Sequence, residues 1–348
     1  MNAAHASPGG ALDGPQIVSL ASAYYGSATL FAALDCGVFA QVEQQPGASA
    51  GDLARALSVD RRGLRLLLDG CVALGLLELT GDGYRNTAAG AEMLVPGASR
   101  DLTRAIRYNQ DVYAAWGRLV SLVRTGRPVE APETHLGADP ERTRRFVQAM
   151  HGRALGIGRA VVPMLELGGL RRLLDVGGGP GTYSMLMAQA AEGLACTVLD
   201  LPGILAVARE LIDEAGLAQR VATLAGDYHT TPFPGGQDAV VFFGVLHQEP
   251  PETIVVLLQR AYEALRPGGV IHVLDLMTDP THTQPPFSAL FAINMALTTE
   301  HGWVFAESEL TGWMAQAGFV SIRGRPVPPP MPHTLVSARK PDALGRGG

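Results

Sequence analysis

The spacing of hydrophobic positions changes about halfway along the chain. Before residue 170, apolar side chains mostly recur every three or four residues, as in residues 61–74, and this spacing predicts helices. Further along, short apolar runs alternate with helical stretches, which is typical of a doubly wound parallel sheet. We therefore expect a mainly helical N-terminal half followed by an α/β domain.

The N-terminal half is expected to form a winged helix. Residues 17–34 predict an alanine-rich apolar helix, and because it lacks a fully polar face we expect it to be buried on more than one side. Residues 49–57 and 61–74 predict two further helices. Residues 76–87, with Gly-Asp-Gly at their centre, predict a tight hairpin that completes the winged helix.

Two helical stretches, residues 101–125 and 140–167, connect the halves and are rich in aromatic side chains. Such side chains can pack between domains, or they can wall a pocket for a flat apolar ligand, and we weigh these two interpretations evenly. The candidates for a pocket wall are Tyr108, Tyr113, Trp116, Phe146, Met150 and His151.

The second half predicts an α/β fold with a doubly wound, Rossmann-like sheet. Its first strand is expected at residues 173–176, and it ends with an antiparallel hairpin of residues 319–327 and 333–339. The other strands are expected at residues 194–201, 221–225, 238–246 and 269–276. The segment Leu265-Arg-Pro-Gly-Gly269 predicts a turn before the last of these.

Chain length supports this division into domains. At 348 residues the chain exceeds the usual size of a single hydrophobic core, and 47% hydrophobic residues supply enough apolar side chains for two. We expect a winged-helix domain at residues 15–100, a helical connector at 101–167 and a cofactor-binding domain at 168–342.

Charge bears on whether the winged helix binds DNA. Its helices carry Arg55, Arg61, Arg62 and Arg65, but a net charge of −6 gives no electrostatic reason to bind nucleic acid or an anionic membrane. Arginines on a polar helix face are more often solvated surface. A ligand-responsive DNA-binding protein is therefore a less favoured alternative to a homodimer that pairs through the apolar first helix.

The remaining features of composition indicate a cytoplasmic protein. The three cysteines lie among apolar neighbours, as expected of buried thiols in a reducing compartment rather than of disulfides. We expect no signal peptide and no membrane span, because the sequence has no uninterrupted run of eighteen apolar residues.

A glycine-rich turn follows the first strand of the α/β half. The segment Leu173-Leu-Asp-Val-Gly-Gly-Gly-Pro-Gly-Thr182 joins an apolar strand to a helix, and Gly177, Gly179 and Gly181 allow bare backbone to approach a ligand. Dinucleotide enzymes need a glycine where this chain has Thr182, so pyrophosphate binding is the less favoured interpretation. The pattern Asp-x-Gly-x-Gly-x-Gly, which starts at Asp175, resembles the S-adenosylmethionine pocket of class I methyltransferases.

Ligands of an open parallel sheet gather at the carboxyl ends of its strands. There the second strand supplies Asp200 and Leu201, and we expect Asp200 to grip a ribose. After the third strand, Asp227 can accept from an adenine amino group, and Tyr228 can pack on the ring.

The fourth and fifth strands end in His247 and Asp275, which could pair as a general base and the carboxylate that orients it. A core histidine with a structural role is the alternative for His247. His272, in the middle of a strand, is expected to be structural.

From about Ala21 to Lys340 the chain is similar to the small-molecule O-methyltransferases of plant phenolic metabolism and bacterial polyketide tailoring. In that family the glycine motif binds S-adenosylmethionine, and the acids for ribose and adenine fall on Asp200 and Asp227. The family's base is the histidine of a Leu-His-Asp-Trp segment, which falls on His247. The resemblance implies a homodimer. We expect no metal, because the residues at the strand ends contain no grouping of acids that would hold one.

Two departures from the family bear on the base. Gln248 and Glu249 replace the Asp-Trp pair, and a second carboxylate that flanks the histidine in plant members falls on Val304, which leaves Asp275 as the expected orienting residue. Methylation without a base, or chemistry other than methylation, therefore stays open as an alternative.

The family's acceptor pocket falls on the helix after the fifth strand, at Phe291, Asn294 and Met295. The expected reaction is methyl transfer to a hydroxyl of an apolar, aromatic secondary metabolite.

Overall fold

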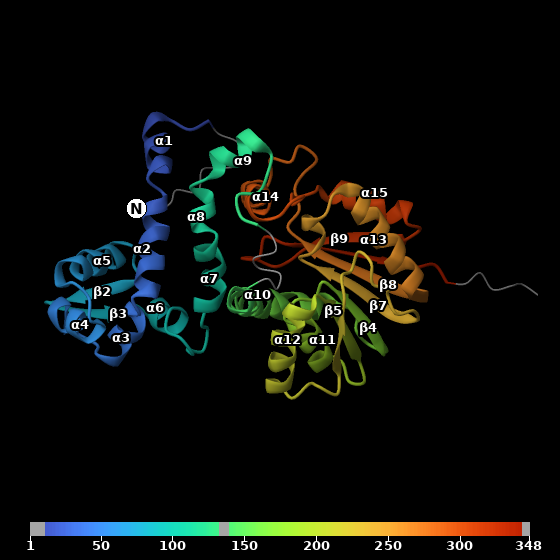
Figure 1. Cartoon of the computed structure of the whole chain (residues 1–348), viewed down its shortest axis with the longest axis horizontal. Coiled ribbons are helices and arrows are strands. Elements are labelled where there is room, and N and C mark those ends of the chain that lie inside the picture. Colours follow the sequence, from blue (N-terminus) through green and yellow to red (C-terminus); the bar gives the residue numbers. More distant parts are fainter. Residues whose placement is uncertain (1–10, 132–138, 343–348) are drawn as a thin grey trace, which may run out of the picture. The chain divides into compact units, whose positions relative to one another are not determined.

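The computed structural model describes residues 11–131 and 139–342, and the chain forms two compact units (Figure 1). The first unit ends at Gln110 and the second begins at Asp111. Residues 101–110 of the expected connector therefore belong to the first unit, and its later described residues belong to the second. The finer division at residues 15–100, 101–167 and 168–342 remains a prediction.

Helices dominate the first unit, together with a small antiparallel sheet in the order β1-β3-β2. Several helices begin where a short polar side chain accepts a backbone N–H of the first turn, as Ser49 and Asp60 do at the starts of α4 and α5. The elements are α1 (Gly14–Ala21), α2 (Tyr24–Asp35), α3 (Val38–Gln44), β1 (Ala48–Ser49), α4 (Ala50–Leu57), α5 (Arg61–Ala73), β2 (Leu77–Thr80), β3 (Gly83–Asn86), α6 (Ala88–Met93) and α7 (Thr103–Asp111), whose last residue lies across the boundary.

The expected helix pair and hairpin are present as α4, α5 and β2–β3, with Leu77 opposite Asn86 and Thr80 opposite Gly83. Arg55 and Arg65 form ion pairs with Asp52 and Asp69 of their own helices. The sequence analysis did not predict α3, α6 or the two-residue strand β1.

The helix expected over residues 17–34 is interrupted. The chain turns at Ser22 and Ala23 between α1 and α2, and Ser22 Oγ donates to the carbonyl oxygens of Val18 (3.3 Å) and Ser19 (3.2 Å). The expectation that this segment is buried on several sides is wrong for the single chain, because only Ala33 of α1 and α2 is buried. Its exposed apolar side chains are Ile17, Val18, Leu20, Tyr24 and Tyr25.

The same segment, Gly14–Asp35, is long and apolar enough to cross a membrane by length and composition, contrary to the expectation from the sequence. Core helices of globular proteins and signal sequences meet the same criteria, so one such helix is weak evidence for a span.

The second unit contains the parallel sheet and its helices. Before the sheet come α8 (Tyr113–Trp116), α9 (Leu119–Thr125), α10 (Pro140–Val161) and η2 (Val162–Met164). The sheet and its connections are β4 (Arg172–Val176), α11 (Thr182–Ala190), β5 (Ala195–Asp200), α12 (Pro202–Glu214), β6 (Val221–Ala225), β7 (Gln237–Phe243), η3 (Leu246–Gln248), α13 (Pro251–Ala264), β8 (Leu265–Asp275), α14 (Pro286–Thr298), α15 (Glu307–Gln316), β9 (Val320–Pro326) and β10 (Thr334–Arg339).

The strands lie in the order β6-β5-β4-β7-β8-β10-β9. The first five pair in parallel, and β10 is antiparallel to both of its neighbours, so the expected doubly wound sheet with a C-terminal antiparallel hairpin is confirmed. From β4 the chain moves outward through β5 to β6 and then returns to the other side of β4 as β7. The carboxyl ends of β4 and β7 therefore form the switch point where such sheets bind ligands.

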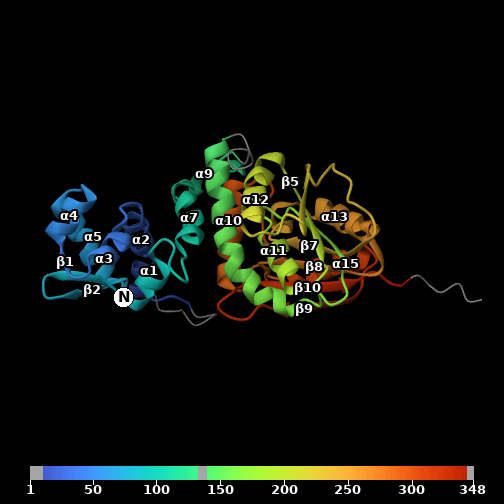
Figure 2. The same ribbon diagram turned by 90° about the horizontal axis from the view of Figure 1, so that it is seen from below.

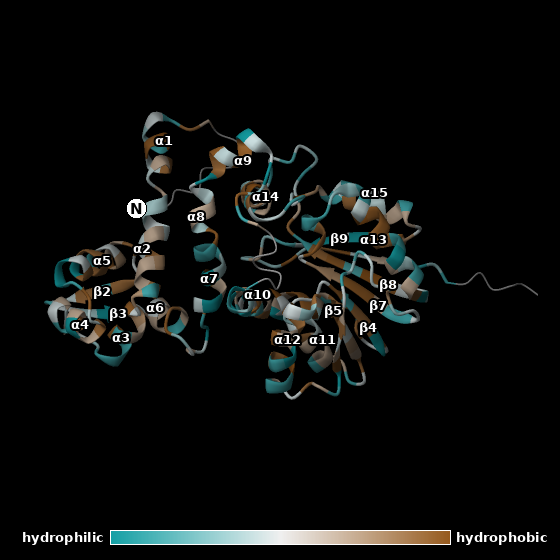
Figure 3. Cartoon of the chain, in the orientation of Figure 1, coloured by the Kyte–Doolittle hydropathy of each residue, from teal (hydrophilic) through white to brown (hydrophobic). Residues whose placement is uncertain are grey.

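Helices cover both faces of this sheet. Apolar side chains of α10, α11 and α12 pack on one face, and those of α13 and α15 pack on the other. Figure 2 shows α10 running beside α11 and α12, in agreement with their contacts. The buried central strands β4, β7 and β8 are mostly hydrophobic along their length (Figure 3), as expected of strands covered on both sides.

Two boundaries differ from prediction. Strand β7 ends at Phe243, three residues early, because Gly244 takes a positive φ of +72° and directs the chain into η3. Strand β8 starts at Leu265, so the residues expected to form a turn belong to a strand whose register with β7 shifts. The connector helix expected over residues 101–125 is divided into α7, α8 and α9.

Candidate active site

The glycine turn lies where β4 and β7 meet at the switch point. Gly177 has a φ of +65°, and a Cβ at this position would lie 2.8 Å from Cγ2 of Val245, the second residue after β7. Its N–H donates to the carbonyl oxygen of Leu199 in β5 at 2.8 Å. Glycine is therefore required both for the left-handed backbone and for the close approach of the two segments.

Gly179 forms the open part of the same turn. Its φ is +54°, and no atom lies within 4 Å of the place where a Cβ would stand. Its N–H donates to Asp200 Oδ2 at 2.8 Å, and the N–H of Leu201 donates to Asp200 Oδ1 at 2.7 Å. These bonds orient the carboxylate at the end of β5 and leave each oxygen a further lone pair for a ribose hydroxyl.

Burial raises the pKa of Asp200 to about 6, and the two backbone donors oppose this shift. The ionised carboxylate therefore lies in a poorly solvated place, where hydrogen bonds from a ligand are stronger than in water.

Asp175 lies beneath the turn and is fully buried. Its Oδ2 accepts from the hydroxyl of Ser184 at 2.8 Å, and its Oδ1 has no hydrogen-bond donor among the described residues. Burial raises its pKa to about 7, and the charge of Asp200 adds to this shift. An unpartnered buried oxygen costs stability, so the site fits a group that brings a donor or a positive charge.

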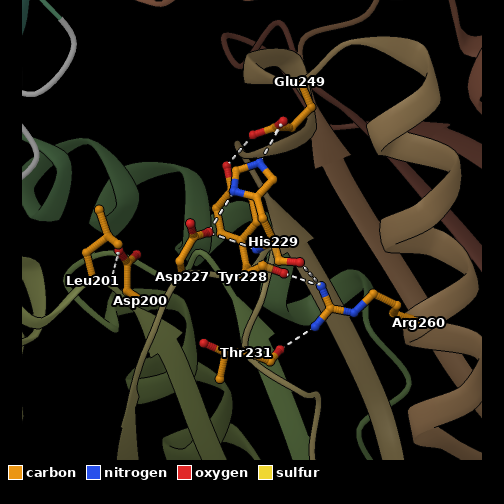
Figure 4. Close-up of polar contacts among 8 residues, drawn as sticks. All are labelled: Asp200, Leu201, Asp227, Tyr228, His229, Thr231, Glu249 and Arg260. Atoms are coloured by element: carbon orange, nitrogen blue, oxygen red, sulfur yellow. Dashed lines mark hydrogen bonds and ion pairs between the residues drawn. The ribbon is translucent and has the colours of Figure 1, made fainter.

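The end of β6 contributes a connected set of polar side chains (Figure 4). The two hydrogen bonds to the Asp227 carboxylate, from the N–H of His229 at 2.8 Å and from its ring Nδ1 at 2.6 Å, both reach Oδ1. The other ring nitrogen, Nε2, lies 3.0 Å from Glu249 Oε2. Tyr228 donates its hydroxyl to Glu249 Oε1 at 2.5 Å. These contacts connect the acid expected at adenine to the segment that carries His247.

His247 and Asp275 form a buried pair. The ring Nδ1 of His247 lies 2.6 Å from Asp275 Oδ1, and the backbone N–H of His247 donates to Oδ2 at 3.3 Å. The N–H of Leu276 also donates to Oδ1, at 2.9 Å. An ionised Asp275 favours the tautomer with the proton on Nδ1, which leaves Nε2 free to accept a proton.

Two aromatic residues hold His247 in place. Trp303 donates its backbone N–H to the carbonyl oxygen of His247 at 2.9 Å, and its indole N–H donates to the carbonyl oxygen of Glu249 at 2.8 Å. Phe291 of α14 meets the imidazole edge to face, with ring centroids 5.4 Å apart. The base candidate is thus fixed through both its backbone and its ring.

Val304 lies where plant members of the resembling family carry a second carboxylate, and it is buried and apolar. The nearby Glu309 instead accepts from the backbone N–H of Ala306 at the start of α15, at 2.7 Å. Asp275 is therefore the carboxylate that contacts the His247 ring among the residues that the structure describes.

Comparison with known proteins shows the family. A family model of the O-methyltransferase domain matches residues 125–320, and a model of the O-methyltransferase dimerisation domain matches residues 18–96. The chain belongs to this O-methyltransferase family. It is an S-adenosylmethionine-dependent methyltransferase of secondary metabolism, and it carries a dimerisation domain.

Individual relatives match along most of the chain. A 3-hydroxy-5-methyl-1-naphthoate 3-O-methyltransferase of Streptomyces sahachiroi is 32% identical, over 88% of this chain and 90% of the relative. An 8-O-methyltransferase of tetracenomycin polyketide synthesis from Streptomyces glaucescens is 31% identical, over 93% and 96%. The solved structure of human N-acetylserotonin methyltransferase with S-adenosylmethionine is 25% identical, over 96% and 99%, with a TM-score of 0.85.

The residues expected to line the acceptor pocket of this O-methyltransferase have different surroundings in the structure. Trp116 donates its indole N–H to Asn294 Oδ1 at 3.0 Å, which joins α8 to α14. Phe291, on the same helix as Asn294, contacts His247. These three residues therefore lie on the connected structure around the base candidate, and Met295 is buried like its neighbour Asn294.

Two other candidates lie beside residues of the expected cofactor site. Phe146 packs with Leu201 against a small cluster on α12, and His151 Nδ1 lies 2.8 Å from the hydroxyl of Thr182 at the start of α11. Tyr108 belongs to the first unit. Tyr113 is exposed and Met150 is half-buried.

The contacts of four residues of the site were not predicted from the sequence. These residues are His229, Glu249, Arg260 and Trp303. Only His229 had a local signal, because it directly follows Asp227 and Tyr228 at a strand end. The other three lie far from their partners in sequence, and only the fold brings them together.

Proposed function

We propose that this enzyme transfers the methyl group of S-adenosylmethionine to a hydroxyl of an aromatic secondary metabolite, with His247 as general base. The observation that carries the proposal is the 2.6 Å contact between His247 Nδ1 and Asp275 Oδ1. It presents the other ring nitrogen, Nε2, as a proton acceptor in a buried site.

The chemistry needs a base because a phenol has a pKa near 10 and is mostly protonated at neutral pH. Bound S-adenosylmethionine supplies an electrophilic methyl group. His247 Nε2 takes the acceptor's proton as the oxygen becomes the nucleophile, and Asp275 stabilises the resulting imidazolium through Nδ1. Trp303 and Phe291 hold the ring in place during this step.

Each part of the cofactor has a candidate contact. Asp200 accepts from the ribose hydroxyls, with Leu201 beside it, and Asp227 accepts from the adenine amino group with Tyr228 on the ring. Gly177, Gly179 and Gly181 bring the backbone close to the ligand, and Asp175 places a negative charge under the turn. The open space at Gly179 and the unpartnered Oδ1 of Asp175 support this assignment.

An aromatic acceptor is supported by the names of two relatives, which methylate a hydroxynaphthoate and a tetracenomycin polyketide. We propose that Asn294, Phe291 and Trp116 lie on the acceptor side of the site. We further propose that the enzyme is a homodimer that pairs through its dimerisation domain, because α1 and α2 leave large apolar side chains exposed.

Base-independent methylation is the second candidate. The observation that favours it is the buried valine at position 304, which removes one of the carboxylates expected near the base.

Replacement of His247 by Ala decides between the two. We expect turnover of 3-hydroxy-5-methyl-1-naphthoate or a similar hydroxynaphthoate to fall by about a hundredfold or more, the usual scale for a lost general base. Calorimetry should show nearly unchanged affinity for S-adenosylhomocysteine. His301→Ala, at an exposed position, is the matched control. Unchanged turnover of the His247 variant would remove the base role and favour the second candidate.

A further inference from the structure

Glu249 replaces an aromatic residue of the resembling family, and here its carboxylate is buried. Each of its oxygens has a partner from the end of β6: Oε1 accepts from the Tyr228 hydroxyl at 2.5 Å, and Oε2 lies 3.0 Å from His229 Nε2. The carbonyl oxygen of Glu249 accepts from the Trp303 indole at 2.8 Å. Its side chain and backbone are therefore both fixed.

His229 lies between two carboxylates. Its Nδ1 is 2.6 Å from Asp227 Oδ1 and its Nε2 is 3.0 Å from Glu249 Oε2 (Figure 4). A neutral imidazole has one N–H and could satisfy only one of these acids, whereas an imidazolium donates to both. The two carboxylates raise the pKa of His229 above its ordinary value of 6.5, although desolvation opposes this effect.

The backbone of the same loop is also fixed. Arg260 of α13 donates to the carbonyl oxygens of Tyr228, His229 and Thr231. The groups that face His229 are therefore Asp227, Tyr228, Glu249 and the guanidinium of Arg260. The loop cannot move without breaking several charge-assisted hydrogen bonds.

We propose that His229 and Glu249 are positioning residues of the adenine site: the His229 imidazolium bridges Glu249 and Asp227 and holds Asp227 Oδ2 toward the adenine amino group. This inference rests on the proposed role of Asp227. Both side-chain contacts of Asp227 reach Oδ1, so Oδ2 is the oxygen available to a ligand. Glu249 also fixes the Tyr228 hydroxyl, and through it the ring that packs on adenine.

This arrangement gives Glu249 a role that its buried position alone does not explain. The Asp227 side chain is 48% exposed, so without the bridge only the backbone N–H of His229 would hold its carboxylate. A ligand would then have to order the carboxylate on binding, which weakens affinity. The bridge also joins the adenine loop to the segment of His247, two residues from Glu249.

The test compares two ligands that differ only at the adenine amino group. Calorimetry with S-adenosylhomocysteine and with its purine-riboside analogue, in which hydrogen replaces that amino group and N1 is unchanged, gives a ratio of dissociation constants for each variant. Asp175 and Asp200 titrate in the same pH range, but they would act on parts that both ligands share, so their effects cancel in the ratio.

Glu249→Gln and His229→Asn should each lower this discrimination by about tenfold, the scale of one charge-assisted hydrogen bond. The matched controls are Glu252→Gln and His301→Asn, both at exposed positions, and they should leave the ratio unchanged. Thermal unfolding of each variant shows that the comparison is made on folded protein.

The pH profile tests the imidazolium directly. In the wild type the discrimination should be greatest below the ordinary histidine pKa of 6.5 and should fall as pH rises above it, because His229 loses its proton above its raised pKa. In His229→Asn the ratio should be flat over this range. A structural role without charge would leave the wild-type profile flat as well.

The outcomes distinguish failure of the positioning role of His229 and Glu249 from failure of the adenine-binding role of Asp227. If Asp227→Asn leaves discrimination intact, the adenine role of Asp227 fails. If Asp227→Asn lowers it while Glu249→Gln and His229→Asn do not, or if the wild-type ratio does not change with pH, the positioning role fails alone. None of these results depends on His247.

Discussion

In the proposed mechanism, Asp275 determines which nitrogen of His247 can act on an acceptor. Its Oδ1 faces Nδ1 at 2.6 Å, and it also accepts backbone N–H groups from His247 and Leu276. The resemblance to plant members of the family places a second carboxylate beside the histidine, but here that position holds the buried Val304. Among the described residues, the orientation of the proposed base therefore depends on Asp275 alone.

Replacement of Asp275 by Asn should lower turnover by at least about tenfold, because an amide can donate to Nδ1 and favour the wrong tautomer. The affinity for S-adenosylhomocysteine should stay close to that of the wild type. Steady-state kinetics and calorimetry measure the two quantities. Asp213→Asn, on an exposed face of α12, is the control, and equal turnover of both variants would contradict the orienting role.

His272 gives a prediction about stability. Burial lowers its pKa to about 4, because its neutral ring lies inside β8 with Nδ1 2.7 Å from Ser337 Oγ of β10. Between about pH 6.5 and about pH 4 the unfolded chain binds a proton at this residue that the folded chain does not. The contribution of His272 to stability is thus greatest above pH 6.5 and falls as pH drops through this range.

His272→Asn should therefore show a smaller loss of unfolding free energy between pH 7 and pH 5 than the wild type in urea titrations. The raised pKa values of Asp175 and Asp200 act in the opposite sense, and the comparison of variant with wild type removes them. His301→Asn should retain the wild-type dependence. Equal slopes for wild type and His272→Asn would show that His272 does not titrate as described.

At the scale of elements, the glycine turn joins two strands that are far apart in sequence. Gly177→Ala places a Cβ 2.8 Å from Val245 at a φ of +65°, so we expect affinity for S-adenosylhomocysteine to fall at least about tenfold. Gly216→Ala has the same backbone strain, with a φ of +69°, but no atom lies within 4 Å of its Cβ. Gly216→Ala should lower stability without lowering affinity for S-adenosylhomocysteine, and calorimetry compares the affinities of the two variants.

The element pattern of the α/β half was predictable because its signals are local. Strand β4, the glycine turn and α11 follow from contiguous residues, and so does the acid at the end of β5. The break between α1 and α2 was not predictable, since Ser22 and Ala23 contain no proline or glycine to interrupt the helix. The early start of β8 was missed because Pro267 and two glycines favour a turn locally, while pairing with β7 makes the segment a strand.

The site was predictable where a residue directly follows a strand, as Asp200, Asp227 and His247 do. It was not predictable where the partner comes from a distant part of the chain. Trp116 and Asn294 are 178 positions apart, and Tyr228 and Glu249 are 21 apart. Such pairs depend on how helices and loops meet above the sheet, and no local pattern of hydrophobic positions encodes that.

At the scale of the whole molecule, the exposed apolar face of α1 should control assembly. Val18 is 71% exposed, and Val18→Glu should weaken dimerisation by at least about tenfold because it places a charge in the proposed interface. Sedimentation velocity over a range of concentrations measures the effect. Val256→Glu, at a residue of α13 that is 50% exposed, should leave assembly unchanged. A monomeric wild type would contradict the proposed interface.

Because β10 lies between β8 and β9, we expect the proposed base to be supported only after β10 has been made during synthesis. Asp275 lies opposite Thr334, so the strand that carries the orienting acid remains an open edge until the ribosome has made β10. Strand β9 is made earlier, but it pairs with β10 and therefore cannot join the sheet until β10 has been made. A nascent chain stopped at Pro326 would expose the hydrophobic edge of β8 and would be prone to aggregate. Strand β10, which is made after β8 and β9, thus completes this edge of the sheet and the support of the proposed base.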